Sequence, residues 1–137
     1  MRIIQIVNSA YGVRNAIGAR PMYVARQLGE GDELLVLARG ATEEARETYD
    51  IRQCGLGSFM GKVLKGANVY LWRGFPHKKI LQRRFEADAA KWLRSLPIER
   101  FDAIHTWAEI PEIAAEAKSR NPRLVVIRDV SMRPECA

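Results

Sequence analysis

A histidine and an arginine-containing loop stand where two apolar segments of the chain end. His105 lies near the end of one apolar segment, and Arg14 follows the first apolar segment, between Gly12 and Gly18. Glycines let a backbone loop approach a sugar or a phosphate closely, and a guanidinium can donate paired hydrogen bonds to a phosphate. If the two segments are parallel strands of one sheet, all four residues gather at its carboxyl edge, where open α/β sheets bind ligands. The sequence therefore predicts ligand contacts at that edge.

The same residues also fit an interpretation without a ligand. Gly12 and Gly18 can simply turn the chain and leave Arg14 on the surface, and His105 can be an ordinary half-buried histidine. Asp129, directly after the last apolar segment, completes the predicted substrate-binding set because of its position. No serine or cysteine stands on a recognisable nucleophile elbow, so the sequence assigns no catalytic residue.

Cofactor and metal motifs are missing or misplaced. The nearest approach to GxGxxG, at 55–61, follows the third expected strand and contains one residue too many. A P-loop also fails, because its glycines are too close together and Val63 follows Lys62. Cys54 and Cys136 have neither CxxC spacing nor a histidine cluster, which argues against a zinc site, a redox pair and a disulfide framework. We therefore expect a cytoplasmic protein with no metal and no cofactor bound by this domain.

Positive charge is concentrated in one segment of the chain. Residues 58–100 contain ten lysines and arginines against three acids, a balance of +7, whereas the whole chain carries +6. Such a block favours an anionic partner, such as a phosphorylated substrate or lipid headgroups, although a solvated helix face explains it equally well. Because no motif that reads nucleic acid accompanies the block, we expect no nucleic acid as a partner.

Aromatic residues accompany the first part of this basic block. Tyr70, Trp72 and Phe75 occur close to Lys65 within the segment 59–75. A segment of this kind can lie in a membrane interface, where its apolar side chains are buried and its cations meet anionic lipid. Packing beneath a sheet is the alternative. The inner face of the membrane is therefore a second expected location beside the cytoplasm.

Alternating apolar segments and helical periodicities indicate an α/β protein. The 137 residues, 47% of them hydrophobic, are enough for one domain, 1–137, with its own core. Continuous apolar strands joined by helices predict a Rossmann-like three-layer α/β/α fold. Right-handed crossovers then give a five-stranded parallel sheet in the order 3-2-1-4-5. The expected strands are 2–8, 33–38, 48–53, 102–107 and 123–128, and the expected helices are 20–28, 111–120 and two pieces within 58–96, interrupted at 74–76. The second of these pieces carries an expected apolar seam at Leu81, Phe85, Ala89, Trp92 and Leu96.

Two short motifs carry a resemblance to a known family. The first is a helix-to-strand pattern, L-A-x-x-L-x-x-x-G-H-E-V. This chain matches it at Ala25, Leu28, Gly31 and Glu33, with one residue fewer between Leu28 and Gly31 and with Asp32 in place of the histidine. The second is a strand end, D-[VI]-[IV]-H-x-H, which it matches at Asp102, Ile104 and His105, with Trp107 in place of the second histidine. On these motifs the chain resembles the N-terminal half of GT-B glycosyltransferases of the family 4 type.

The resemblance implies an acceptor-binding domain. In such enzymes a C-terminal domain with an E-x7-E motif holds the nucleotide-sugar donor, and that domain is absent from this sequence. The implied partners are a donor-binding domain or subunit, a sugar or lipid-linked acceptor, and an anionic membrane surface. The alternative is a freestanding Rossmann-like module that binds a small anionic ligand without catalysis.

Overall fold

The fold is an α/β arrangement built on one central sheet. The computed structural model describes residues 1–11, 21, 23–56, 58–66, 76–107 and 110–128. Its strands are β1 (Arg2–Tyr11), β2 (Glu33–Ala41), β3 (Asp50–Gln53), β4 (Ala103–Thr106) and β5 (Val125–Arg128). Its helices are α2 (Glu43–Thr48), α3 (Ser58–Gly66), α4 (His77–Ser95) and α5 (Pro111–Arg120), with the 3-10 turn η2 at Ile98–Arg100. Residues 21 and 23–25 are also helical.

The five strands are all parallel and follow the order β3-β2-β1-β4-β5, which confirms the predicted topology. β1 is the central strand, and Ile4 lies opposite both Leu35 of β2 and Ile104 of β4. The chain leaves β1 toward β2 in one direction and returns later to β4 on the other side. The boundary between β1 and β4 is therefore the topological switch point, beside which doubly wound folds bind their ligands.

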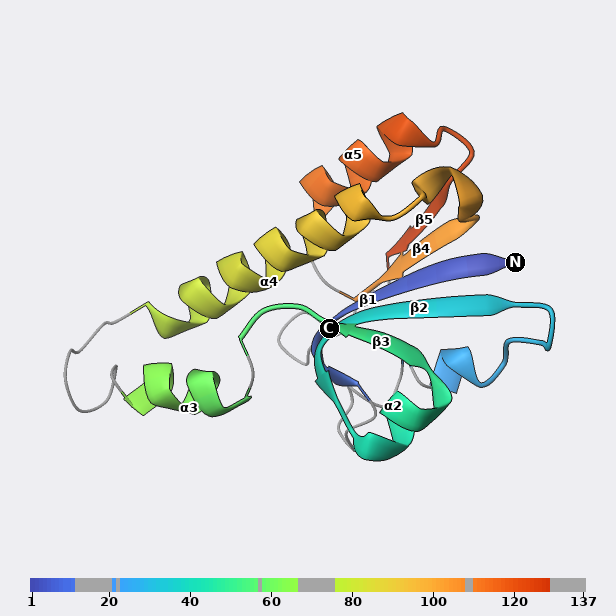
Figure 1. Ribbon diagram of the computed structural model, residues 1–137. Helices are drawn as coiled ribbons and strands as arrows, with labels where there is room; N and C mark the ends of the chain where they lie inside the picture. Colours follow the sequence, from blue (N-terminus) through green and yellow to red (C-terminus); the bar gives the residue numbers. More distant parts are fainter. Residues whose placement is uncertain (12–20, 22, 57, 67–75, 108–109, 129–137) are drawn as a thin grey trace, which may run out of the picture.

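Helices cover the sheet on both faces (Figure 1). α4 and α5 pack on one face over a core that includes Ile4, Ile6, Leu37 and Phe85. α2 lies on the other face, over a smaller core that includes Val7 and Tyr11. Because side chains alternate along a strand, the apolar β-branched residues of β1 supply both cores in turn.

Two local details differ from the sequence-based expectation. The chain forms the short helix α2 immediately before β3, where the sequence analysis placed no helix. Its cap explains it, because the Thr42 Oγ1 accepts a hydrogen bond from the backbone N–H of Ala45 at 3.2 Å, and two acids follow in the first turn. In α4, Phe85, Ala89 and Leu93 are fully buried, whereas Trp92 and Leu96 pack at the edge of the core. The apolar seam is thus rotated slightly from its predicted position.

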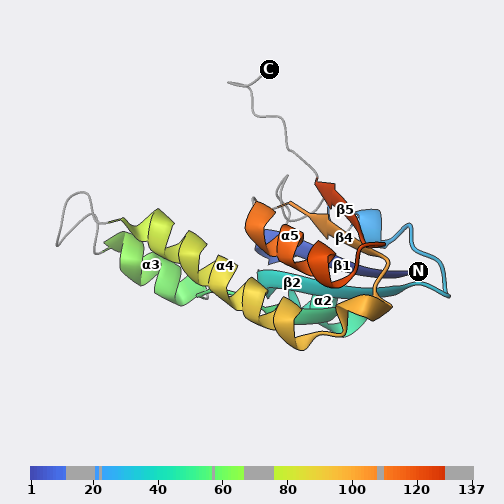
Figure 2. The same cartoon turned by 90° about the horizontal axis from the view of Figure 1, so that it is seen from above.

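The long helix α4 extends past the carboxyl edge of the sheet. Figures 1 and 2 both show its N-terminal part beside α3, extending beyond the carboxyl ends of the strands, and the two helices are in contact. We call α3 and the N-terminal half of α4, residues 77–84, the basic arm. Among the helices that the structure describes, none has the length and apolarity needed to cross a bilayer.

Candidate ligand site at the carboxyl edge of the sheet

The strand β1 carries a bulge near its carboxyl end, and its pairing with β2 resumes after the bulge. Val7 pairs with Ala38 of β2, but the next pair joins Ala10 to Gly40, so residues 8 and 9 stand opposite Arg39 alone. A bulge bends the strand and re-aims its side chains, and bulges are frequent beside active sites. This one brings Asn8 and Arg39 to the same level, at the carboxyl ends of the two strands.

Three buried polar atoms at this edge have no hydrogen-bond partner within the part of the chain that the structure describes. They are the Asn8 Oδ1, the Arg39 Nε and the Trp107 Nε1. Asn8 lies in β1, Arg39 lies in β2, and Trp107 directly follows β4. These three strands are neighbours in the sheet, and the switch point lies between β1 and β4. A buried polar atom without a partner costs about 1–3 kcal/mol, so folded proteins rarely keep one without a reason. Three at one edge indicate groups that a ligand can satisfy.

A chain of side-chain amides leads from β1 to α4. The Asn8 Nδ2 donates to the Gln82 Oε1, and the Gln82 Nε2 donates to the Glu86 Oε1 at 3.0 Å. Glu86 in turn lines a groove of about 440 Å³ between α4 and the first turns of α5, together with Arg83, Ile110 and other residues of the two helices. This volume lies within the roughly 300–1,000 Å³ of small-molecule sites. The amide chain therefore holds the Glu86 carboxylate in the groove wall.

The opposite face of the same edge combines a buried polar pair with two rings. Gln5 is buried, accepts a hydrogen bond from the Tyr11 hydroxyl at 2.7 Å and donates one to the backbone carbonyl of Pro21 at 3.1 Å. Burial raises the pKa of Tyr11, so its hydroxyl keeps its proton for that bond. On the neighbouring strand the rings of His105 and Trp107 stack at 3.8 Å between centroids, tilted by 35°. His105 lies level with Gln5 across the β1–β4 boundary.

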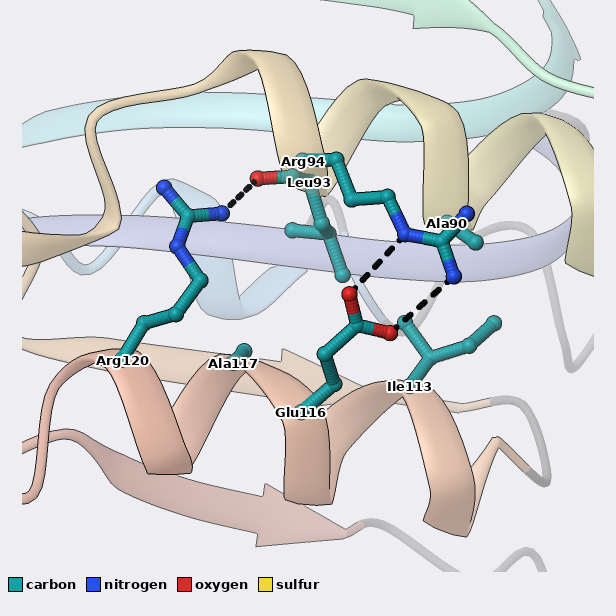
Figure 3. Close-up of a pocket in the computed structure, with 7 residues that line it drawn as sticks. All are labelled: Ala90, Leu93, Arg94, Ile113, Glu116, Ala117 and Arg120. Atoms are coloured by element: carbon teal, nitrogen blue, oxygen red, sulfur yellow. Dashed lines mark hydrogen bonds and ion pairs between the residues drawn. The ribbon is translucent and has the colours of Figure 1, made fainter.

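A second cavity between α4 and α5 is too small for a ligand. Figure 3 shows it enclosed by both helices, and its volume of about 10 Å³ holds at most one water. Arg94 closes it with a bidentate ion pair to Glu116, at 2.9 and 3.2 Å. This pair raises the pKa of Arg94 and lowers that of Glu116. Arg120 adds a hydrogen bond to the Leu93 carbonyl at 2.8 Å. These contacts hold the two helices together, and Arg94 and Glu116 also line the groove.

Of the predicted site residues, His105 lies at the carboxyl edge as expected from its strand. Gly12, Arg14, Gly18 and Asp129 lie outside the described residues. Thus the structure places one member of the predicted set and does not test the contacts predicted for the other four.

Two further residues from the sequence analysis have roles that the structure defines. Asp102 of the D-x-x-H motif lies at the opposite edge of the sheet, where its Oδ2 accepts the backbone N–H of Arg2 at 2.8 Å. Cys54 is buried, and this burial, with Asp88 nearby, raises its thiol pKa to about 12, so it is no nucleophile at neutral pH. In the described ranges no three His, Cys, Asp or Glu side chains are grouped to hold a metal ion.

The sequence analysis did not identify Asn8, Arg39, Gln82 or Trp107 as site residues. Asn8 is the last residue of one expected strand and Arg39 directly follows another, so their positions carried a usable signal. Gln82 had none, because it comes from a helix more than 70 residues after Asn8 in the sequence. Trp107 was noted only as the residue standing in place of a histidine.

Comparison with known proteins found no significant relative of this chain. No family model matches the chain, and no curated protein or solved structure matches it significantly.

Proposed function

We propose that this chain is the acceptor-binding domain of a sugar-nucleotide-dependent glycosyltransferase of the GT-B type, and that its acceptor binds at the carboxyl edge between β1 and β4. The observation that carries the proposal is a set of three buried polar atoms around the switch point that have no partner in the described part of the chain. They belong to Asn8, Arg39 and Trp107. The family resemblance of the sequence, at Ala25 to Glu33 and at Asp102 to His105, supports the type of reaction.

A sugar acceptor fits the chemistry of this edge. Its hydroxyls donate and accept hydrogen bonds, so they suit an orphaned amide oxygen on Asn8 and an orphaned indole N–H on Trp107. On the opposite face of this edge from Asn8, the stacked rings of His105 and Trp107 offer an aromatic surface. The groove beside Glu86 leaves room for the rest of the acceptor.

Transfer requires a donor-binding domain or subunit that brings the nucleotide sugar to the same cleft. Val125 and Ile127 of the outer strand β5 are 55% and 46% exposed. Apolar side chains on an uncovered edge strand favour a docked partner. We propose that this partner is the donor-binding half.

The basic arm supports attachment of the domain to an anionic membrane, where a lipid-linked acceptor would reside. Lys78 and Lys79 lie in the first turn of α4, and no acid accompanies them there. The N-terminus of a helix carries a partial positive charge, so lysines placed there lower the stability of the helix. A role in binding an external anion, such as a lipid headgroup, explains this placement. The arm also carries the exposed Lys62 and Lys65 of α3.

A freestanding module that binds a small anion without catalysis is the second candidate function. Arg39 favours it, because this half-buried cation has no acidic partner within the described ranges. The coding region distinguishes the two functions. An adjoining sequence with E-x7-E supports the glycosyltransferase, and its absence supports the module.

Calorimetric titration of the full chain with hexoses, disaccharides and hexose phosphates tests the acceptor site. We expect at least one of these probes to bind, and Trp107→Ala and Arg14→Ala to weaken its binding tenfold or more. Arg100→Ala, an exposed change beyond the opposite edge, is the matched control and should bind normally. Equal affinity of all four proteins would contradict the proposed site.

Co-sedimentation with vesicles tests the basic arm. Vesicles with anionic lipid should bind the chain at low salt and release it at high salt, because a Debye length of about 8 Å at 0.15 M screens exposed charges. The double variant Lys78→Glu, Lys79→Glu should lose this binding. Absence of binding at low salt would remove the membrane from the proposal.

A further inference from the structure

We infer that Arg39 binds the phosphate group of a small phosphorylated ligand at the carboxyl end of β2. This inference is independent of whether the chain is half of a glycosyltransferase, because it depends on the surroundings of one side chain. Arg39 lies on the α4 face of the sheet, with its guanidinium carbon 6.0 Å from the centre of the buried Phe85 ring.

Arg39 is a partly buried cation with no counter-charge in the described ranges. Its Nε is buried without a hydrogen-bond partner. The carboxylate of Asp88, one turn after Phe85 on α4, is occupied elsewhere: it accepts the backbone N–H of Gly55 at 2.7 Å and pairs with Arg84 at 3.4 Å. A cation removed from water is costly unless it is paired, and the ring contact, at the outer limit of cation–π distance, is a weak substitute.

Burial itself disfavours the charge, and it lowers the pKa of Arg39. Arginine nevertheless stays protonated in proteins at neutral pH, so the site keeps a positive charge. Arg39 is also only partly covered, which leaves it accessible to a ligand. The charge is therefore available to an anion and is not neutralised by the fold.

The geometry favours a phosphate. A guanidinium presents its donors in a planar fork that matches two oxygens of a phosphate. The bulge of β1 places Asn8 at the level of Arg39, and its orphaned Oδ1 can accept a hydroxyl of the same ligand. The ligand class is thus a phosphate monoester of a hydroxylated molecule.

Thermal unfolding with inorganic phosphate and with glycerol 3-phosphate tests the inference. Both should raise the Tm of the natural chain above its value in sodium chloride of equal ionic strength, because a ligand that binds the folded state stabilises it. Arg39→Met should lose this rise, with at least a tenfold weaker apparent affinity. Arg46→Met, which removes an exposed arginine of α2 and changes the net charge equally, is the matched control and should keep it.

The Nε–H signal of Arg39 in a ¹⁵N–¹H spectrum of the natural chain gives a readout that does not depend on the variant's folding. It should shift as phosphate is added and stay unchanged with chloride. Vesicles containing phosphatidic acid distinguish a lipid headgroup from a soluble ligand. If the ligand is soluble, added phosphate should shift the Arg39 signal and the vesicles should not. An unshifted signal at saturating phosphate, or binding by Arg39→Met within twofold of the natural chain, would overturn the inference.

Discussion

The two edges of the central sheet treat their polar groups in opposite ways. At the amino edge the groups pair with one another. The N-terminal amine lies 2.9 Å from the Asp32 carboxylate, and the Arg2 backbone N–H donates to Asp102. The Asn121 Nδ2 donates to two backbone carbonyls, of Ile98 and Phe101, both at 3.0 Å.

At the carboxyl edge the side chains of Asn8, Arg39 and Trp107 each keep a buried polar atom without a partner among the described residues. The same strand, β1, runs through both edges, so the difference does not come from the sheet as a whole. The polar groups of the amino edge therefore bond to one another and contribute to stability, whereas those of the carboxyl edge leave hydrogen-bonding capacity for a ligand. Substitutions at the two edges should therefore have different consequences.

The largest effect on stability is expected from Asn121→Ala at the amino edge. This change removes the donor from two carbonyls and the acceptor from the backbone N–H of Arg123. Loss of such partners should lower the free energy of unfolding by about 1–3 kcal/mol, measured in urea. Ligand binding by the folded variant should be unchanged. A variant as stable as the natural chain would contradict the role given to this edge.

A smaller effect is expected from Trp107→Phe at the carboxyl edge. Phenylalanine keeps a smaller aromatic ring at this position, and an N–H with no partner among the described residues is removed, so the free energy of unfolding should change by less than about 1.5 kcal/mol. The affinity for the acceptor should nevertheless fall, because the N–H donor is lost. A strong loss of stability with normal binding would assign Trp107 to the core and not to the site.

The smallest effect concerns pH and the amino edge. The hydrogen bond from the N-terminal amine, with one from the Gly29 N–H, lowers the pKa of Asp32, and the same pair raises the pKa of the amine. Because the Asp32 carboxylate has a lower pKa in the folded state, it stabilises the fold at pH values above its unfolded-state pKa, near 3.9. This stabilisation is lost as the pH falls through the folded-state pKa. The amine contribution is lost in the other direction, as pH rises through its raised pKa.

Both groups are exposed, so the changes in Tm should be slight and should shrink with salt. Asp32→Asn should remove the acid-side change. An equal fall in Tm for both proteins below pH 4 would show that the pair does not contribute.

The sequence predicted the fold well because its signals are local. The apolar runs at 2–8 and 33–38 contain few polar interruptions, and the helix at 111–120 starts at Pro111 and has the bounds that the sequence indicated. Strand order followed from the handedness of crossovers and needed no knowledge of side-chain contacts.

The site was less predictable because its defining features depend on distant contacts. The missing partner of Arg39 is visible only when α4 is packed on β2, with Phe85 under the guanidinium and Asp88 occupied by Gly55. The bulge opposite Arg39 comes from the register of two strands, which residue types do not determine. His105 could be placed from its strand, but its ring partner Trp107 required the structure.

The proposed ligand site at the carboxyl edge can be tested directly through the indole N–H signal of Trp107. The signal is followed in a ¹⁵N–¹H spectrum of the full chain during titration with hexoses, disaccharides and hexose phosphates. Trp92 provides an internal control, because its indole N–H already donates to the Gln53 carbonyl at 3.2 Å. We expect a ligand that binds to shift the Trp107 signal and leave the Trp92 signal in place. A bound ligand that leaves the Trp107 signal unchanged while it shifts backbone signals at the amino edge, around Arg2 and Asn121, would contradict a ligand site at the carboxyl edge.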